Sequence, residues 1–130
     1  MNEKLMQMLE EMTKKSKLDE SMMQQINEYL SGKRKKFDID YAIFNEMSEF
    51  KKKVLMACFE IEYGQTKTYA QIAEEIGNPK GYRAVGNALN KNEYPIIIPC
   101  HRVVGTDKKM HGYAGGIELK KELLRLESKK

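Results

Sequence analysis

A cysteine and a histidine stand side by side at positions 100 and 101, at the end of an apolar run bracketed by two prolines. A thiol beside an imidazole is a candidate nucleophile, because the reactive thiolate forms when a neighbouring base takes the proton. Adjacent side chains on a strand point to opposite faces, so Cys100 and His101 cooperate only where the backbone turns sharply or a water lies between them. Pro99 also ends regular strand pairing. The motif therefore predicts a bend after a buried strand or extended segment at residues 96–98.

The competing interpretation of this pair is structural, because free cysteine usually behaves as a small buried hydrophobe. That interpretation suits Cys58, which lies on the apolar stripe of an expected helix and is predicted to be buried and inert. With two cysteines and only His101 and His111, the chain has neither a disulfide framework nor a spaced set of zinc ligands. We therefore expect no metal and no cofactor.

The length and the charge of the chain exclude several classes of protein. The 130 residues suffice for one core and a small appendage, which excludes a large two-domain enzyme. No segment has the length of a membrane span, and the N-terminus lacks the composition of a signal or transit peptide, so we expect a soluble cytoplasmic protein. The net charge is +4, and between residues 78 and 113 six basic residues face two acidic ones. This third of the chain is where an anionic partner is expected to bind.

The first 47 residues predict a pair of helices followed by a linker. Apolar residues recur at helical spacing over residues 5–12 and again over residues 18–30, where Gly32 follows as a helix-ending residue. Residues 37–41 alternate between apolar and polar, which is typical of a short strand or an extended linker. A domain boundary is expected within residues 40–47.

The following residues predict a helix-turn-helix. Ser48 is a suitable N-cap for one helix, and Thr66 or Thr68 for the next. The Asn-Pro-Lys-Gly sequence at residues 78–81 is a strong turn signal, and helical spacing resumes over residues 82–90.

Two short helices joined in this way form a helix-turn-helix. The second helix is rich in small residues, so it either packs tightly inside the protein or lets a DNA backbone approach, and Arg83 favours DNA. A last helix, ending near Glu127, carries mixed charges typical of an exposed face.

Taken together, these segments closely resemble the O6-alkylguanine-DNA alkyltransferases, also called methylated-DNA–protein-cysteine methyltransferases. The order and spacing match over residues 48–127, and the Pro-Cys-His-Arg-Val run is a specific motif. The matching residues are Tyr63-Gly64, Thr68-Tyr69, Gly77-Asn78-Pro79-Lys80, Arg83-Ala84-Val85-Gly86, Asn92, Pro99-Cys100-His101-Arg102-Val103-Val104, Tyr113, Gly115-Gly116, Leu123-Leu124 and Glu127.

The resemblance implies a DNA repair protein that acts once. Such a protein binds duplex DNA through the minor groove, extrudes the O6-alkylated guanine and moves the alkyl group irreversibly onto its cysteine, here Cys100. Free cysteine has a pKa of about 8.5, so the thiol needs a base at neutral pH. By the same resemblance His101 is that base, acting through a water, and Glu127 holds the imidazole and stabilises its charge.

Further roles are carried over from the same resemblance. Tyr69 would hydrogen-bond the departing guanine, Arg83 would fill the gap left in the base stack, and Asn92 would brace the bend before Cys100. The remaining expected DNA contacts are Lys80, Ala84, Gly86, Lys91 and Arg102, with Lys80 and Lys91 our own candidates for binding phosphates. The residues expected to form the substrate pocket are Pro95, Val103, Tyr113, Ala114 and Gly115.

This chain also departs from the family pattern. Ala114 replaces a serine that often follows the pocket tyrosine, so only a backbone N–H remains there to serve the O6 atom. Residues 1–47 are short for the first domain of the family and lack its usual strands. We therefore expect a reduced N-terminal domain of helices with at most one or two strands.

The predicted fold is α+β and mainly helical. A winged-helix-like C-terminal domain over residues 48–130 contains the helix-turn-helix and a small β element near residues 96–98, and residues 1–47 form the reduced N-terminal domain. The expected partner is double-stranded DNA containing O6-alkylguanine, bound by a monomer near the nucleoid, with no membrane and no metal.

Two other functions are weighed against alkyl transfer. One is a non-catalytic module that binds alkylguanine or acts as a helix-turn-helix regulator; the presence of Cys100 argues against it, because such relatives replace the cysteine. The other is a Cys-His hydrolase, which is disfavoured because its histidine usually comes from a distant part of the chain.

Overall fold

The computed structural model describes residues 2–105, 113 and 116–128. The chain is mainly helical with one pair of very short strands, which confirms the predicted α+β class. No helix in these ranges is long and apolar enough to cross a membrane. In chain order the elements are α1 (Glu3–Lys14), α2 (Glu20–Leu30), the 3-10 helix η1 (Tyr41–Glu46), α3 (Glu49–Phe59), β1 (Lys67–Thr68), α4 (Tyr69–Glu75), α5 (Tyr82–Asn90), the 3-10 helix η2 (Cys100–Arg102), β2 (Val103–Val104) and α6 (Ile117–Ser128).

The expected helical pair at the N-terminus is confirmed. Asn2 and Asp19 cap α1 and α2 through their side-chain oxygens, and each helix buries one apolar stripe. Residues 37–40 are extended but pair with no strand among the described residues, and η1 follows them. Of the two forms expected for that segment, the extended linker is therefore the one observed.

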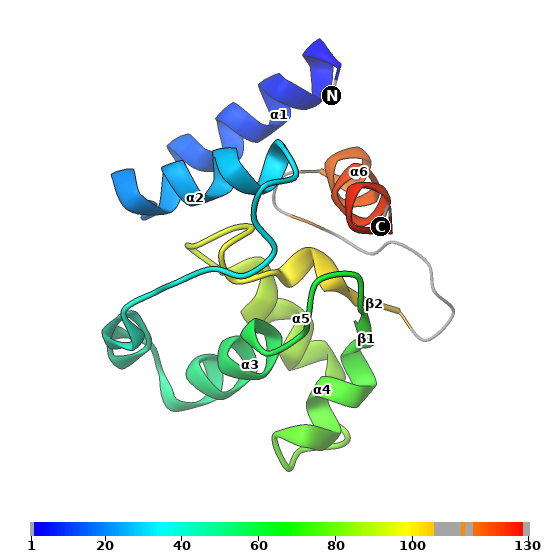
Figure 1. Ribbon diagram of the computed structural model, residues 1–130. Coiled ribbons are helices and arrows are strands. Elements are labelled where there is room, and N and C mark those ends of the chain that lie inside the picture. Colours follow the sequence, from blue (N-terminus) through cyan, green and yellow to red (C-terminus); the bar gives the residue numbers. More distant parts are fainter. Residues whose placement is uncertain (1, 106–112, 114–115, 129–130) are drawn as a thin grey trace.

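The expected helix-turn-helix is also confirmed. Ser48 caps α3, and Thr68 caps α4 in a reciprocal capping box with Gln71. The turn between α4 and α5 closes where the Gly81 amide donates to the Asn78 carbonyl at 2.9 Å. Helices α3, α4 and α5 pack against one another on the opposite side of the molecule from α1 and α2 (Figure 1).

The prediction of a strand at residues 96–98 is wrong. All three isoleucines are fully buried, as expected, but Ile96 and Ile97 form a turn, flanked by an isolated bridge between Pro95 and Ile98. The small β element lies elsewhere: β1 and β2 run parallel, with Lys67 beside Val103. Because β2 follows η2 directly and β1 precedes α4 directly, this pair fixes the Cys-His turn against the start of the helix-turn-helix.

One hydrophobic core extends through both parts of the chain. It includes residues of α1 and α2 together with residues of α3, α5, η2 and α6, and the segment carrying η2 runs between the two groups of helices (Figure 1). Helices α1 and α6 are in contact, and Lys4 pairs with Glu118 at 3.1 Å across them. The division into domains at residue 47 stays a prediction.

The capping box at Thr68 gives a direct test of the fold. Thr68→Ala removes the side-chain acceptor for the Gln71 amide, so we expect the free energy of unfolding to fall by about 1 kcal/mol. The melting temperature should fall by about 4 °C. Thr66→Ala is the matched control, because exposed Thr66 was the alternative cap and makes none. Equal losses in the two variants, measured by thermal unfolding, would contradict the capping role.

Candidate functional site

Two consecutive tight turns produce the bend that places Cys100. The Ile97 amide donates to the Pro95 carbonyl at 2.8 Å, and the Cys100 amide donates to the Ile98 carbonyl at 2.8 Å. Each bond spans only two residues, which makes a γ-turn. Pro99 lies at the centre of the second turn with φ −80° and ψ 64°, a conformation that suits its ring. The sharp bend predicted between the apolar run and the Cys-His pair is therefore confirmed.

The first of these turns is strained, and Asn92 holds it closed. Ile96 has φ 70°, a left-handed conformation that a β-branched residue adopts only when its surroundings impose it. The Asn92 side-chain amide donates to the Ile98 carbonyl at 2.9 Å and lies 3.4 Å from the Cys100 sulfur. Its carbonyl oxygen accepts from the Tyr94 amide at 2.9 Å. Asn92 thus ties both ends of the loop together at the thiol.

Cys100 is buried and protonated in its resting state. Its exposed fraction is 8%, and burial raises the pKa of the thiol, although the Asn92 hydrogen bond and the charge of Lys120 lower it in part. A thiol of this kind needs a base to become nucleophilic. Cys58 is fully buried with a raised pKa, also because of burial, as predicted for an inert core residue.

The Glu127 carboxylate is the centre of a buried polar cluster. Its Oε2 atom lies 2.6 Å from His101 Nε2 and accepts from the Tyr29 hydroxyl at 2.5 Å. Arg102 donates to Oε1 from Nε at 2.8 Å and to Oε2 from Nη2 at 3.1 Å. Burial would raise the pKa of Glu127, but the hydrogen bonds and charges of His101 and Arg102 outweigh it and lower the pKa to about 2. Glu127 is therefore ionised.

Arg102 is a correction to the predicted set of DNA contacts. Its exposed fraction is 3%, and besides Glu127 its guanidinium donates to the Ile61 carbonyl at 2.7 Å. A buried carboxylate requires a partner of this kind, because an unpaired buried charge is very costly. The guanidinium is occupied inside the protein, so we remove it from the residues that contact DNA.

His101 has the protonation state that a base requires. Burial lowers the pKa of the fully buried imidazole, although Glu127 opposes this, so the ring is neutral at neutral pH. Ionised Glu127 can only accept a hydrogen bond, so His101 Nε2 must carry the proton that it donates. The lone pair of the neutral ring is then on Nδ1. Among the described residues, His101 Nδ1 and the Tyr113 hydroxyl are buried polar atoms without a hydrogen-bond partner. The two rings meet edge to face, with centroids 6.5 Å apart.

Tyr69 and Lys120 contact each other near Cys100. Lys120 Nζ lies 3.5 Å from the Tyr69 hydroxyl and 5.7 Å from the centre of its ring. A Cβ atom added at Gly86 would lie 3.8 Å from this ring, an ordinary contact distance, so α5 lies beside Tyr69 at this position.

Two buried side chains of the site, Lys120 and Tyr29, were not predicted. The mixed charges of the last helix were interpreted as an exposed face, yet Lys120 is 1% exposed, and Glu127, which the resemblance placed beside His101, is 3% exposed. They are seven residues apart, which places them on one helix face with Leu123, and that spacing was a usable signal. Tyr29 was placed on an apolar stripe, but its hydroxyl needed a buried partner, which only the tertiary structure supplies.

The outer face of α5 is open and basic. Arg83 and Ala84 are exposed, as are Lys80 before the helix and Lys91 after it. No ion pair or hydrogen bond holds these three basic side chains within the described part of the chain.

Of the predicted pocket residues, Pro95 and Val103 are buried. Ala114 and Gly115 lie outside the described residues.

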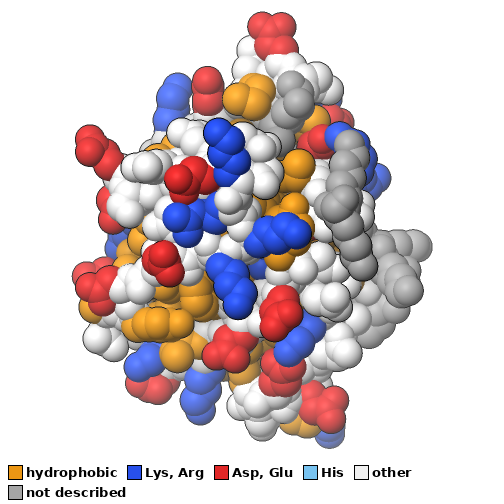
Figure 2. All heavy atoms as spheres, viewed as in Figure 1, with side chains coloured by type: hydrophobic (Ala, Val, Ile, Leu, Met, Phe, Trp, Pro, Cys, Tyr) orange, Lys and Arg blue, Asp and Glu red, His pale blue; other side chains and the backbone are white. Residues whose placement is uncertain are grey.

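Other basic side chains are held by internal contacts. Arg34 pairs with Glu28 at 2.8 Å, and Lys35 lies over the Tyr63 ring at 5.3 Å. Figure 2 shows several Lys and Arg side chains near the middle of the face viewed in Figure 1, with acidic side chains around them.

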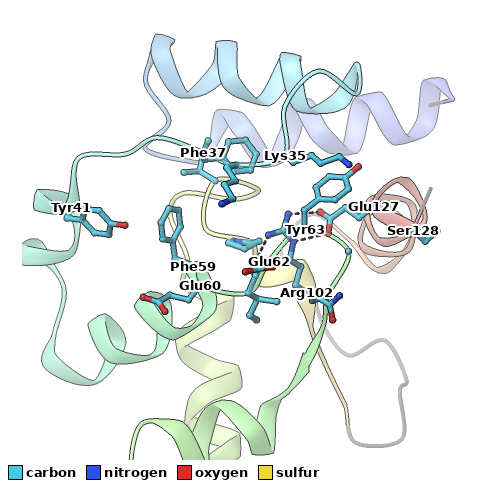
Figure 3. Close-up of a pocket in the computed structure, with 16 residues that line it drawn as sticks. Lys35, Phe37, Tyr41, Phe59, Glu60, Glu62, Tyr63, Arg102, Glu127 and Ser128 are labelled. Atoms are coloured by element: carbon cyan, nitrogen blue, oxygen red, sulfur yellow. Dashed lines mark hydrogen bonds and ion pairs between the residues drawn. The ribbon is translucent and has the colours of Figure 1, made fainter. Parts of the chain in front are cut away.

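A cleft of about 900 Å³ opens behind the polar cluster and does not include Cys100 in its lining. Figure 3 shows Tyr63, Lys35 and the Arg102–Glu127 pair at one end of this cleft and Tyr41 at the other. The cleft therefore reaches the rear of the pair, away from the thiol. Across the described ranges, no group of three His, Cys, Asp or Glu side chains could hold a metal ion.

The lowered pKa of Glu127 predicts a specific acid sensitivity. A carboxyl with a pKa of about 2 when folded and about 4.3 when unfolded stabilises the fold fully above about pH 5. That stabilisation is lost as the pH falls toward 2. Glu127→Gln leaves Arg102 without its counter-charge and should cost about 3 to 5 kcal/mol at neutral pH. The stability difference between wild type and variant should shrink by about 2 kcal/mol from pH 6 to pH 3.

Denaturant unfolding at the two pH values measures this difference. Glu118→Gln is the matched control, because it removes an exposed carboxylate of the same helix that pairs with Lys4 at the surface. This control should cost less than about 0.5 kcal/mol at neutral pH. A Glu127→Gln variant whose deficit does not change with pH would contradict the assignment.

Comparison with known proteins identifies the family. A family model described as the DNA-binding domain of 6-O-methylguanine DNA methyltransferase matches residues 49–129. A methylated-DNA–protein-cysteine methyltransferase of Methanosarcina barkeri is 52% identical over 103 residues, which cover 79% of this chain and 64% of the relative. The chain thus spans somewhat less than two thirds of that relative's length.

Two solved structures extend the comparison. The crystal structure of Mycobacterium tuberculosis OGT in complex with DNA has a TM-score of 0.75 and 39% identity, and covers 83% of this chain and 66% of its own. The structure of S. pombe Atl1 in complex with damaged DNA containing O6-carboxymethylguanine has a TM-score of 0.56 and 34% identity, covering 62% of this chain and 77% of its own. With a family model matching more than half of its length, this chain belongs to the 6-O-methylguanine DNA methyltransferase family.

Proposed function

We propose that this protein repairs DNA by transferring the O6-alkyl group of an alkylated guanine irreversibly to Cys100. The observation that carries the proposal is the arrangement around the bend: a braced thiol at Cys100, a neutral His101 with its Nδ1 lone pair available, and an ionised Glu127 holding Nε2. This is the order of nucleophile, base and orienting acid that activates a weak nucleophile. Membership of the family supports the same reaction.

The reaction balances in one displacement. His101 Nδ1 takes the thiol proton of Cys100 through a water, and Glu127 stabilises the imidazolium that results. The thiolate attacks the alkyl carbon, the S–C bond forms, and the C–O6 bond breaks with its electron pair going to the guanine. The guanine takes up one proton in place of the alkyl group, which balances the thiol proton that His101 releases when it returns to its neutral form. Because the S–C bond is stable, each molecule reacts once.

Tyr69 is the proposed donor to the departing base. Its hydroxyl lies beside the Lys120 ammonium, whose charge also favours the thiolate form of Cys100. A donor aimed at the negative charge that develops on the guanine lowers the barrier of the displacement. Pro95, Val103 and Tyr113 are the proposed pocket residues within the described chain, and Ala114 and Gly115 would complete the pocket.

The open face of α5 is the proposed DNA-binding surface. Arg83 would enter the base stack when the damaged guanine is extruded, Ala84 and Gly86 would allow close approach, and Lys80 and Lys91 would bind phosphates. We further propose that a cytoplasmic monomer binds the minor groove in this way, without metal. In this division residues 48–130 bind DNA and carry Cys100, while residues 1–47 support them.

Transfer to Cys100 is tested by intact-protein mass spectrometry after incubation with O6-methylguanine duplex DNA. One added methyl group that maps to Cys100, with no more than one per molecule, is the expected result. Cys100→Ala should abolish the uptake yet retain binding to the damaged duplex, because the thiol contributes chemistry rather than contact area. Wild-type protein that binds the lesion but takes up no methyl group would support the alternative of a non-catalytic alkylguanine-binding module.

The role of Arg83 is tested by comparing two substrates. Arg83→Ala should slow transfer from the duplex by about 10- to 100-fold, because extrusion of a base costs a few kcal/mol. Transfer from free O6-benzylguanine should be nearly unchanged, since the free base needs no extrusion. Lys53→Ala on α3 is the matched control for loss of an exposed positive charge. Equal losses on both substrates would rule out a role of Arg83 in extrusion.

A further inference from the structure

The N-terminal helical pair reaches directly into the reaction centre. Tyr29 belongs to α2 and is fully buried, and its hydroxyl donates to Glu127 Oε2 at 2.5 Å. The same oxygen lies 2.6 Å from His101 Nε2. One atom of the carboxylate therefore joins the base of the proposed reaction to a residue 98 positions from Glu127 in the sequence.

We propose that Tyr29 is a positioning residue for alkyl transfer, whose phenol fixes Glu127 Oε2 so that the carboxylate holds His101 with its Nδ1 lone pair directed to the thiol side. This inference rests on the proposed function and adds to it a contribution from residues 1–47. Without the phenol, the carboxylate keeps its bonds to Arg102 but loses one of the donors that set its orientation toward the imidazole.

The packing around Tyr29 holds its hydroxyl in place. Its ring lies 5.6 Å from the Phe37 ring and 6.0 Å, edge to face, from the Tyr63 ring, measured between centroids. Phe37 comes from the extended linker and Tyr63 from the segment before β1, so two separate parts of the chain confine the same ring. Figure 3 shows Tyr63 beside the Arg102–Glu127 pair. A fully buried ring packed against two other rings gives its hydroxyl a single direction, which is what orienting a carboxylate requires.

The phenol also affects how strongly Glu127 attracts the imidazole proton. Burial and the charge of Glu127 raise the pKa of Tyr29, so its hydroxyl remains a donor throughout the neutral range. A hydrogen bond to a carboxylate withdraws part of its negative charge. Tyr29 therefore moderates the pull of Glu127 on the His101 proton and helps to keep the imidazole neutral.

The other charged groups around the imidazole do not reverse this lowering of the His101 pKa. The positive charges of Arg102 and Lys120 also lower the pKa of His101, while Glu127 raises it. Within the described residues, the other titratable groups near His101 or its partners include Cys58, Tyr63, Cys100 and Tyr113, with Lys35 over the Tyr63 ring and Tyr69 near Cys100. Removal of the Tyr29 hydroxyl leaves Glu127 more basic, so the pKa of His101 rises and a larger fraction of the base is protonated at a given pH.

Tyr29→Phe tests the proposal while keeping the buried ring. The rate constant for transfer should be measured from pH 5.5 to 9 with free O6-benzylguanine and with O6-methylguanine duplex DNA. We expect transfer at pH 6.5 to slow by about 10- to 100-fold on both substrates, the scale of one hydrogen bond to a charged group. The acid limb of the pH–rate profile should move to higher pH by about 0.5 to 1 unit, and the affinity for DNA should not change.

Tyr63→Phe is the matched control. Its hydroxyl also reaches α6, where it lies 3.4 Å from the Leu126 carbonyl, but it does not bond to the Glu127 carboxylate. We expect this variant to keep the wild-type acid limb. A Tyr29→Phe protein that unfolds more easily but keeps the wild-type rate and acid limb would show that the phenol is only structural and would overturn the proposal. A loss confined to duplex DNA would overturn it equally.

A titration of His101 by nitrogen-15 NMR separates this inference from the proposed function. The chain has two histidines, so a His111→Gln background leaves one signal to follow. Introducing Tyr29→Phe into this background should raise the pKa of His101 even if wild-type protein transfers no alkyl group. An unchanged pKa would refute the coupling of Tyr29 to His101, whereas absence of transfer in wild type alone would refute the proposed reaction.

Discussion

The buried carboxylate of Glu127 is the interaction on which the site depends. A buried charge is tolerated only when hydrogen-bond donors satisfy it. Glu127 of α6 receives these bonds from Tyr29 of α2 and from His101 and Arg102 of η2. The same bonds that satisfy the charge also fix the imidazole in one tautomer. Stability and reactivity therefore have one origin, and the central contact joins three distant parts of the chain.

The loop before Cys100 is the strained counterpart of this cluster. Ile96 occupies a left-handed conformation that costs of the order of 1 to 3 kcal/mol. Burial of the three isoleucines and the bonds of Asn92 offset that cost. The result is a candidate nucleophile, Cys100, at the end of a rigid, fully packed turn. Such a turn presents the sulfur in one direction, which an in-line displacement requires.

The fold separates the proposed reaction centre from the proposed DNA-binding surface. The polar groups around Glu127 are buried between α2, η2 and α6, whereas the basic side chains near α5 are exposed and unpaired within the described residues. Tyr69 connects the two regions, because it begins α4, packs against Gly86 of α5 and lies beside Lys120 of α6. In the proposed function, a base extruded from DNA bound at α5 would reach Tyr69 and the proposed reaction centre in a single movement.

The sequence by itself determined the local structure and the candidate nucleophile. Caps, turns and helical spacing located the helices, and the Pro-Cys-His-Arg-Val run predicted the bend, because these signals act over a few residues. Burial and pairing were decided only by the tertiary structure. Arg102 was expected on DNA, Lys120 in solvent and residues 96–98 in a strand, and each was wrong because the outcome depends on which remote group lies opposite. For Arg102 that group is Glu127, and for Glu127 it includes Tyr29, contacts that no local pattern encodes.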